Sequence, residues 1–140
     1  MNNLGPSSKD PTDQRPHQKG KAKGKKNGQD VEAEKEWMFD TGATVSAITK
    51  NNADKFDLTP VGATASGTTG GGGIIMKRGL TMVFSIIGRD GNPKEVRCSL
   101  NVGVKPNNSG SEIIGMDQIA TVNAVILWNP KTQTGRIYET

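Results

Sequence analysis

Alternating apolar and polar residues dominate the second part of the chain. Two such runs, residues 80–87 and 96–104, are separated by the turn sequence Arg-Asp-Gly-Asn. In the first run, one face carries Leu80, Met82, Phe84 and Ile86. Because successive side chains of a strand point to opposite faces, this pattern predicts a β-hairpin over residues 79–104.

Shorter segments complete the prediction. Glu-Ile-Ile-Gly at 112–115 reads as a short buried strand, and the five residues after it as a brief helix. Residues 124–128 and 136–139 flank a Pro- and Gly-containing turn and predict a second hairpin. Asn51–Phe56 fits one helical turn. The expected fold class is therefore all-β with one or two short helices.

The first 36 residues differ in character. Apart from the initial Met1, residues 1–30 hold one sizeable apolar side chain, Leu4, and the run Lys-Gly-Lys-Ala-Lys-Gly-Lys-Lys-Asn-Gly, whereas all six aromatic residues lie in 37–140. Such polar, Gly- and Lys-rich composition is typical of disorder. We therefore expect a disordered basic linker or tail over residues 1–36 and one folded domain over 37–140.

The charge is equally uneven. Residues 1–30 carry seven basic and three acidic side chains, which account for the whole net charge of +4. Clustered lysines can neutralise phosphates, so weak nucleic-acid contact by this tail is one interpretation. The tail lacks aromatic residues for base stacking and cysteines for a zinc knuckle, so a plain flexible linker is the other.

Some classes of site are excluded or not expected. Cys98 is the single cysteine, which rules out an internal disulfide or a cysteine-based zinc site. No apolar run approaches the roughly 18 residues of a membrane span, and Met1–Asp10 has no signal-peptide core. We expect no metal, no cofactor and no membrane contact.

The most informative chemistry is the sequence Asp40-Thr41-Gly42-Ala43. The three residues before it and positions 45, 47 and 48 after it are apolar, so the pattern predicts a loop buried in the core. A buried carboxylate is costly unless it is paired or hydrogen-bonded. Gly42 allows a tight turn, and the Thr41 hydroxyl can hydrogen-bond when buried. A buried turn with a satisfied, non-catalytic aspartate is the alternative.

A second feature is the glycine run between two predicted strands, comprising Gly70, Gly71, Gly72 and Gly73, followed by Ile74 and Ile75. It predicts a mobile hairpin tip that can close over a ligand and donate backbone N–H groups. A plain surface loop is the alternative, and the phosphate-binding pattern GxxxxGK[ST] is absent. The third feature, Ile113-Ile114-Gly115, is by itself ordinary core.

Taken in order, these three features resemble the retropepsin-like aspartic proteases, the retroviral and LTR-retrotransposon type. The catalytic loop of that family is Asp-Thr/Ser-Gly-Ala, its flap is rich in glycine, and an apolar-apolar-Gly-x-Asp/Asn segment precedes its helix. The resemblance covers residues 37–140. It implies a small closed β-barrel-like fold with a flap hairpin.

The resemblance also implies roles. Asp40 would be the catalytic acid and base, Thr41 would lock two loops together, and Gly42 would accommodate them. The residues that would bind substrate are Ala43, Gly70, Gly71, Gly72, Gly73, Ile74, Ile75 and Ile113.

Each chain has one Asp-Thr-Gly loop and therefore supplies only one of the two carboxylates that such a protease needs. Hydrolysis of a peptide by carboxylates needs one as base and one as acid, and two-fold symmetry brings equivalent residues together. We therefore expect an aspartic endopeptidase that is active as a homodimer and processes its own retroelement polyprotein, in the cytoplasm or within a virus-like particle. The alternative is a non-catalytic peptide-binding or dimerisation module of the same fold, with an RNA-binding basic tail.

Two departures from the family pattern stand out. Met116 and Thr44 occupy the places where many viral members carry an Arg–Asp ion pair. Family members also have a β-hairpin before the catalytic loop, but residues 28–36 read as too polar and too short for one.

Overall fold

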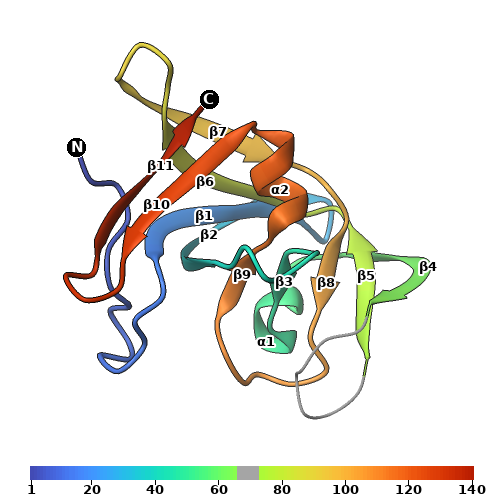
Figure 1. Ribbon diagram of the computed structural model, residues 1–140. Coiled ribbons are helices and arrows are strands. Elements are labelled where there is room, and N and C mark those ends of the chain that lie inside the picture. Colours follow the sequence, from blue (N-terminus) through green and yellow to red (C-terminus); the bar gives the residue numbers. More distant parts are fainter. Residues whose placement is uncertain (66–72) are drawn as a thin grey trace.

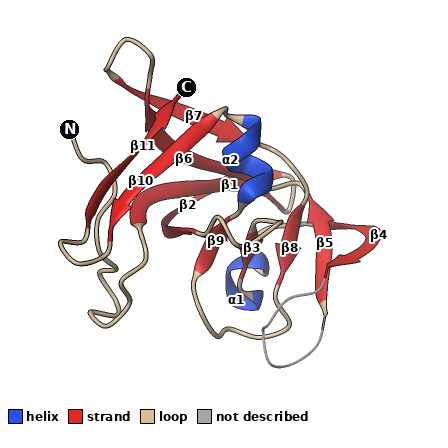
Figure 2. Cartoon of the chain, viewed as in Figure 1, coloured by secondary structure: helices blue, strands red, loops and turns tan. Residues whose placement is uncertain are grey.

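The computed structural model describes residues 1–65 and 73–140. Within these residues it contains one 11-stranded sheet and two short helices, which agrees with the all-β expectation. The strand order is β10-β11-β6-β1-β2-β9-β3-β8-β5-β4, with β7 also paired to β6. Figures 1 and 2 show the sheet curving around the helices, with β10 and β4 far apart. Closure into a barrel stays a prediction. No helix of the described residues is long and apolar enough to cross a membrane.

The prediction of a disordered tail over residues 1–36 is wrong for most of that segment. Strands β1 (His17–Lys26) and β2 (Gln29–Phe39) form a long antiparallel hairpin. Its turn is Asn27-Gly28, where both residues have positive φ, 53° and 78°. Two consecutive positive φ values are the requirement of a type I′ turn, and Asn-Gly is the sequence that best meets it. The hairpin judged too polar to exist therefore precedes Asp40.

Complementary charge explains why so polar a hairpin can form. Lysines of β1 face carboxylates of β2: Lys21 Nζ lies 3.0 Å from Glu32 Oε1, and Lys25 is paired with Asp30. The opposite face is small and apolar. There Ala22 is buried and pairs with Met82 of the neighbouring strand β6 (Thr81–Ile87).

The first residues also belong to the folded unit. The Leu4 side chain is buried, and its N–H donates to the Gly135 carbonyl over 3.1 Å. Gly5 exchanges hydrogen bonds with His17 at 2.9 and 2.8 Å. The domain boundary expected at residue 36/37 is therefore wrong, because the chain on both sides of it shares one sheet.

Three short strands continue the sheet beyond β2. They are β9 (Glu112–Ile114), β3 (Ala47–Ile48) and β8 (Val102–Val104). β9 runs parallel to β2, with Phe39 opposite Ile114, and antiparallel to β3. Because parallel strands end at the same edge, the residues after Phe39 and after Ile114 come together.

The predicted hairpins are present with altered limits. β6 pairs with β7 (Pro93–Cys98), but β8 leaves the hairpin expected over 79–104 to join β3 and β5. The second hairpin consists of β10 (Ala124–Asn129) and β11 (Thr134–Glu139). The two helices are α1 (Lys50–Ala53) and α2 (Met116–Thr121).

The far end of the sheet is another hairpin, β4 (Thr59–Ala65) and β5 (Ile74–Arg78). The two strands are antiparallel, and Ala65 pairs with Ile74 next to the connection. Gly70, Gly71 and Gly72 lie outside the described residues.

Aromatic side chains fill the core between these strands. The Trp37 side chain is fully buried, and its indole N–H donates to the Val83 carbonyl over 3.0 Å. The Phe39 and Phe84 rings meet edge to face with centroids 5.5 Å apart. Gly20 lies directly over the Trp37 ring, where any Cβ would collide with the indole and the Val83 carbonyl oxygen. The strand that leads to Asp40 is therefore firmly anchored.

Candidate active site

The Asp40–Ala43 loop is held by backbone hydrogen bonds to the segment that follows β9. Asp40 N–H donates to the Ile114 carbonyl over 3.0 Å, and Met116 N–H donates to the Ala43 carbonyl over 2.8 Å. Within the loop, Ala43 N–H donates to the Asp40 carbonyl over 3.1 Å. The two segments that the sequence analysis singled out separately are thus joined in space.

The Asp40 side chain lies at the surface of the single chain. It is half-buried, and Thr41 and Gly42 are exposed, so the expectation that this loop lies inside the core is wrong. The chain turns outward after Phe39 and returns to the core at Ser46, so residues 37–39 and 46–49 are buried on either side of an exposed or half-buried segment. Asp40 Oδ1 accepts a hydrogen bond of 2.9 Å from Gly42 N–H. The carboxylate is therefore oriented by its own loop and accessible from outside.

Gly115 is required by close packing against this loop. A Cβ there would lie 2.7 Å from the carbonyl carbon and oxygen of Val45 and 2.9 Å from the Ala43 oxygen. These are backbone atoms that cannot rotate aside. The glycine of Ile-Ile-Gly thus lets the β9–α2 junction approach the Asp40 loop.

The Asp117 carboxylate holds the segment after the loop through hydrogen bonds to Ser46. Asp117 accepts hydrogen bonds from the Ser46 N–H at 3.1 Å and from the Ser46 hydroxyl at 2.7 Å. The Ser46 oxygen in turn accepts from Gly115 N–H at 2.8 Å. Ser46 is fully buried, so this network fixes the strand that follows the Asp40–Ala43 loop. Sequence reasoning gave neither residue this role, because its only signal was an aspartate two residues after Gly115.

The remaining predicted substrate-binding residues that the structure describes lie in the Asp40 loop, on β9, and on or next to β5. Ala43 and Ile113 are half-buried, and Ile113 pairs with both Met38 and Ala47. Ile74 is buried, while Ile75 is 48% exposed and Gly73 is exposed. Strand β5, which carries the two isoleucines, is linked to β3 through β8. Gly70, Gly71 and Gly72 cannot be placed relative to Asp40.

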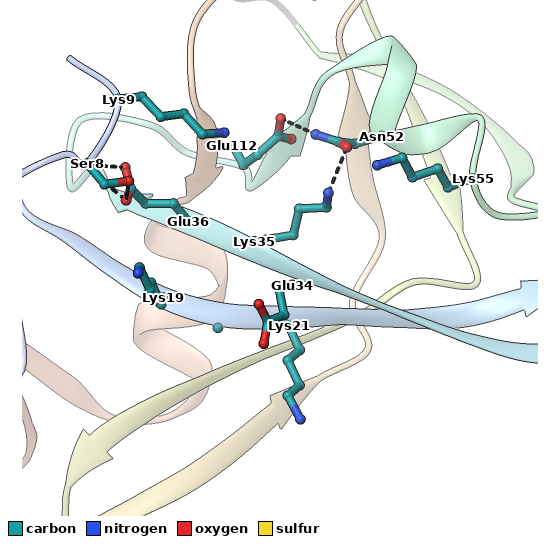
Figure 3. A pocket seen from close by; sticks show the side chains of 11 residues that line it. Ser8, Lys9, Lys19, Lys21, Glu34, Lys35, Glu36, Asn52, Lys55 and Glu112 are labelled. Atoms are coloured by element: carbon teal, nitrogen blue, oxygen red, sulfur yellow. Dashed lines mark hydrogen bonds between the residues drawn. The ribbon is translucent and has the colours of Figure 1, made fainter.

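A separate cavity lies away from this loop. It has a volume of about 540 Å³ and opens beside β1, β2 and α1, and its lining includes none of the residues Asp40–Ala43 (Figure 3).

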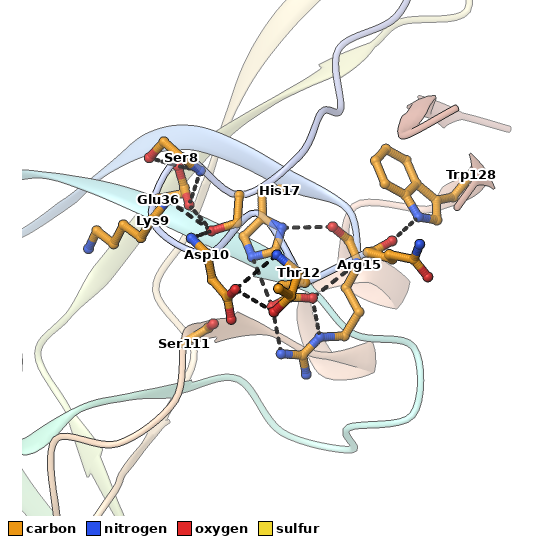
Figure 4. A network of polar contacts seen from close by, with 12 residues as sticks. Ser8, Lys9, Asp10, Thr12, Arg15, His17, Glu36, Ser111 and Trp128 are labelled. Carbon is orange, nitrogen blue, oxygen red and sulfur yellow. Dashed lines mark hydrogen bonds and ion pairs between the residues drawn. The ribbon is translucent and has the colours of Figure 1, made fainter. Parts of the chain in front are cut away.

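The segment before β1 lies beside the strand that leads to Asp40. Phe39 N–H donates to the Pro16 carbonyl over 3.0 Å. Arg15 holds Asp13 with two hydrogen bonds, Nε to Oδ1 at 2.8 Å and Nη2 to Oδ2 at 2.7 Å (Figure 4). The Arg15 hydrogen bond lowers the pKa of Asp13 to about 2, against the opposing effect of burial. The pKa of Arg15 is raised, mainly by Asp13 and to a smaller extent by the charge of Asp40.

The same segment is anchored on both sides. His17 is buried, and its Nδ1 lies 2.7 Å from the Arg15 carbonyl oxygen. The Trp128 indole N–H donates to the Gln14 carbonyl over 2.8 Å. Figure 4 shows Arg15 between these two anchors. An arginine in electrostatic contact with Asp40 is a feature that sequence reasoning missed.

Other nucleophilic or metal-based sites find no support in the described residues. The Cys98 thiol is buried, and burial together with the charge of Asp117 raises its pKa to about 11. Such a thiol stays protonated at neutral pH and is a poor nucleophile. No group of three or more His, Cys, Asp or Glu side chains in the described part of the chain could hold a metal ion.

Comparison with known proteins gives one match. No curated protein matches the chain. A family model described as aspartyl protease matches residues 22–117, which run from the middle of β1 to the start of α2. This range contains the Asp40 loop and the Ile-Ile-Gly segment hydrogen-bonded to it, so the pattern and the geometry agree with the match. The chain belongs to the aspartyl protease family.

Proposed function

We propose that this protein is an aspartic endopeptidase that works as a homodimer, with Asp40 of each copy forming the catalytic pair. The observation that carries the proposal is the state of the Asp40 loop in the single chain. Among the described residues, the half-buried carboxylate accepts a hydrogen bond only from Gly42 of its own loop, and the neighbouring Thr41 and Gly42 are exposed. A surface loop of this kind is suited to meet an identical loop across a two-fold axis.

The other aspartates considered as partners are already engaged. Asp117 is bound to Ser46 on the inner side of the loop. Asp90 accepts from Asn92 in the turn between β6 and β7. The sequence holds no second Asp-Thr-Gly. The second carboxylate is therefore assigned to a second copy.

The chemistry follows from two carboxyls that share one proton, because like charges at close range cannot both ionise. The ionised Asp40 takes a proton from a water molecule, whose oxygen bonds to the peptide carbon. The protonated Asp40 gives its proton to the carbonyl oxygen. Collapse of this tetrahedral intermediate breaks the C–N bond, and the nitrogen leaves with a proton.

The substrate in this proposal is an extended polypeptide. Hairpin β4–β5 serves as the flap, with Gly70–Gly73 at its tip, and binds the peptide as an added strand. Ala43, Ile74, Ile75 and Ile113 line the subsites. The exposed Ile75 side chain on β5 and the surface position of Ala43 support this assignment.

The biological context is carried by the resemblance to retropepsins. We infer processing of the polyprotein of a retroelement, in the cytoplasm or in a virus-like particle. Nucleic-acid binding by the Lys-rich segment is left out of the proposal. Four of its lysines, Lys21, Lys23, Lys25 and Lys26, form ion pairs within the chain.

The test is the substitution Asp40→Asn, compared with Asp54→Asn on the exposed surface beside α1. Cleavage of a peptide library should fall about 1000-fold or more in Asp40→Asn, because the acid–base pair is lost, and should be unchanged in Asp54→Asn. Thermal unfolding should show that both variants fold. Retained cleavage in Asp40→Asn would refute the assignment.

Mixing tests the dimer. After re-equilibration with an equal amount of Asp40→Asn protein, activity per wild-type chain should fall to about half, because random pairing leaves half of the wild-type chains in inactive mixed dimers. Undiminished activity per wild-type chain would rule out a shared site.

A further inference from the structure

The cavity beside β1, β2 and α1 has an uneven distribution of charge. It is formed by five segments of the chain, and its lining contains five lysines and three glutamates. In Figure 3 the ends of Lys9, Lys35 and Lys55 point toward the region around Asn52 and Glu112. The full lining comprises Ser8, Lys9, Lys19, Gly20, Lys21, Glu34, Lys35, Glu36, Asn52, Lys55 and Glu112.

Two of the three carboxylates are satisfied by neutral donors. Glu112 is buried and accepts hydrogen bonds from Thr49 N–H and Thr49 Oγ1, both at 2.9 Å, and from Asn52 Nδ2 at 2.6 Å. Glu36 accepts from the hydroxyl of Ser7 and from the N–H and hydroxyl of Ser8. Neither of these carboxylates forms an ion pair with a cavity lysine in the described part of the chain.

The lysines are correspondingly short of anionic partners. Lys35 Nζ donates to the neutral Asn52 Oδ1 over 2.8 Å. Across residues 1–65 and 73–140, no ion pair involves Lys9, Lys35 or Lys55. Burial lowers the pKa of Lys35, and the charges of Lys55 and Lys9 lower it further, while Glu112 opposes them. Three ammonium groups thus converge on one space and repel one another.

We propose that this cavity is a binding site for a phosphorylated small molecule, whose phosphate group lies between Lys9, Lys35 and Lys55. A phosphate supplies the anionic oxygens that these three ammonium groups do not find among the described residues, and lysine is a common phosphate ligand, acting as a point charge. A volume of about 540 Å³ exceeds the needs of a lone ion and falls in the range of small-molecule pockets. Asn52 Nδ2 binds Glu112 and Oδ1 binds Lys35, which holds the amide between the opposite charges.

The test measures binding of pyrophosphate and ATP to the full chain carrying Asp40→Asn, by calorimetry and by NMR. Binding does not depend on cleavage, so the result stands whether or not the proposed protease activity is found. Lys35→Gln and Lys55→Gln should each weaken binding about tenfold or more, because each removes a charge-assisted hydrogen bond. Lys131→Gln removes the same charge from an exposed turn outside the lining and should leave binding unchanged.

Further readouts keep the proposal falsifiable. Lys55 is exposed, so Lys55→Gln should fold normally even if Lys35→Gln does not. The pKa of Lys35, followed by NMR of its side chain, should rise when the ligand binds. Tighter binding of ATP than of pyrophosphate would support a phosphorylated small molecule. Binding of pyrophosphate alone, equal weakening by Lys131→Gln, or no saturable binding would overturn the proposal.

Discussion

The β1–β2 hairpin and the Asp40–Ala43 loop are adjacent along the chain but differ in how their polar groups are satisfied. In the hairpin, charges on one strand meet opposite charges on the other, as Lys21 does with Glu32. In the loop, the backbone is held on the inner side, while the Asp40 carboxylate, within residues 1–65 and 73–140, bonds only to Gly42, and Thr41 stays exposed.

This difference separates polar residues that serve the fold from polar residues available for chemistry. Near its turn the hairpin pairs its charges within one chain: Lys21 and Lys23 with Glu32, and Lys25 with Asp30. In the loop, backbone hydrogen bonds fix the position of the chain, and the Asp40 carboxylate remains accessible from outside. The contrast indicates that charge density alone does not locate a functional site, whereas an anchored backbone with an uncommitted side chain does.

Among substitutions outside the Asp-Thr-Gly sequence, the largest losses of stability and of peptide cleavage are expected when the hydrogen bonds that hold the loop are removed. Asp117→Ala removes the acceptor for the buried Ser46 N–H and hydroxyl. Leaving a buried donor unsatisfied should lower the free energy of unfolding by about 2 kcal/mol, and peptide cleavage should fall at least about tenfold because the loop shifts. Urea unfolding and steady-state kinetics measure the two effects.

The matched variant is Asp117→Asn, whose amide oxygen keeps one acceptor for Ser46. It should recover part of the stability and part of the cleavage rate. If Asp117→Ala left both quantities unchanged, the loop would owe its position to the backbone contacts of Gly115 and Ile114 instead.

A smaller effect concerns the ion pair that connects the hairpin entrance to the neighbourhood of Asp40. The pKa of Asp13 is lowered from 3.8 to about 2, mainly by Arg15. A carboxyl with a lowered pKa stabilises the fold above its unfolded pKa, and this stability is lost as the pH falls from about 4 through about 2. Asp13→Asn should therefore cost roughly 1 kcal/mol at pH 5, a value reduced for solvent screening of the half-exposed Arg15.

The measurement is urea unfolding of wild type and Asp13→Asn between pH 5 and pH 2. The difference between the two proteins should shrink toward pH 2. A constant difference over this range would show that Asp13 acts through packing and not through its charge.

The smallest effect is expected in the hairpin itself. Lys21 and Glu32 are both about half-exposed, at 48% and 47%, and exposed ion pairs contribute little. Lys21→Gln should leave the urea midpoint almost unchanged, and any shift should vanish at high salt. A large, salt-insensitive loss of stability would mean that the hairpin depends on individual charges, which would weaken the contrast drawn above.

Much of the second part of the chain was readable from period-two patterns. Strands β6, β10 and β11 lie close to where alternation predicted them, whereas the run expected over 96–104 is divided between β7 and β8. The Asp40 loop and the Ile-Ile-Gly segment were also identified, because each is a short run of consecutive residues that can be recognised without knowing the fold.

The hairpin before Asp40 was missed for a physical reason. Composition describes a segment by itself, whereas the stability of β1 and β2 arises from pairing two segments of opposite charge. The sequence Asn27-Gly28 between two alternating runs was a usable signal that composition obscured. The hydrogen bonds between Ser46 and Asp117 join residues 71 positions apart, and no local sequence pattern indicates them.

The buried Leu4 has a consequence for the order in which the molecule is completed. Its backbone pairs with Gly135, and the neighbouring Asn3 exchanges hydrogen bonds with Ile137. Contacts between residues so distant in sequence form slowly. During synthesis, Asn3 and Leu4 remain without these partners until residues 135–137 have been made. The contacts of the amino-terminal residues with β11 therefore form late in folding. The complete fold is reached only after residues 135–137 have been synthesised.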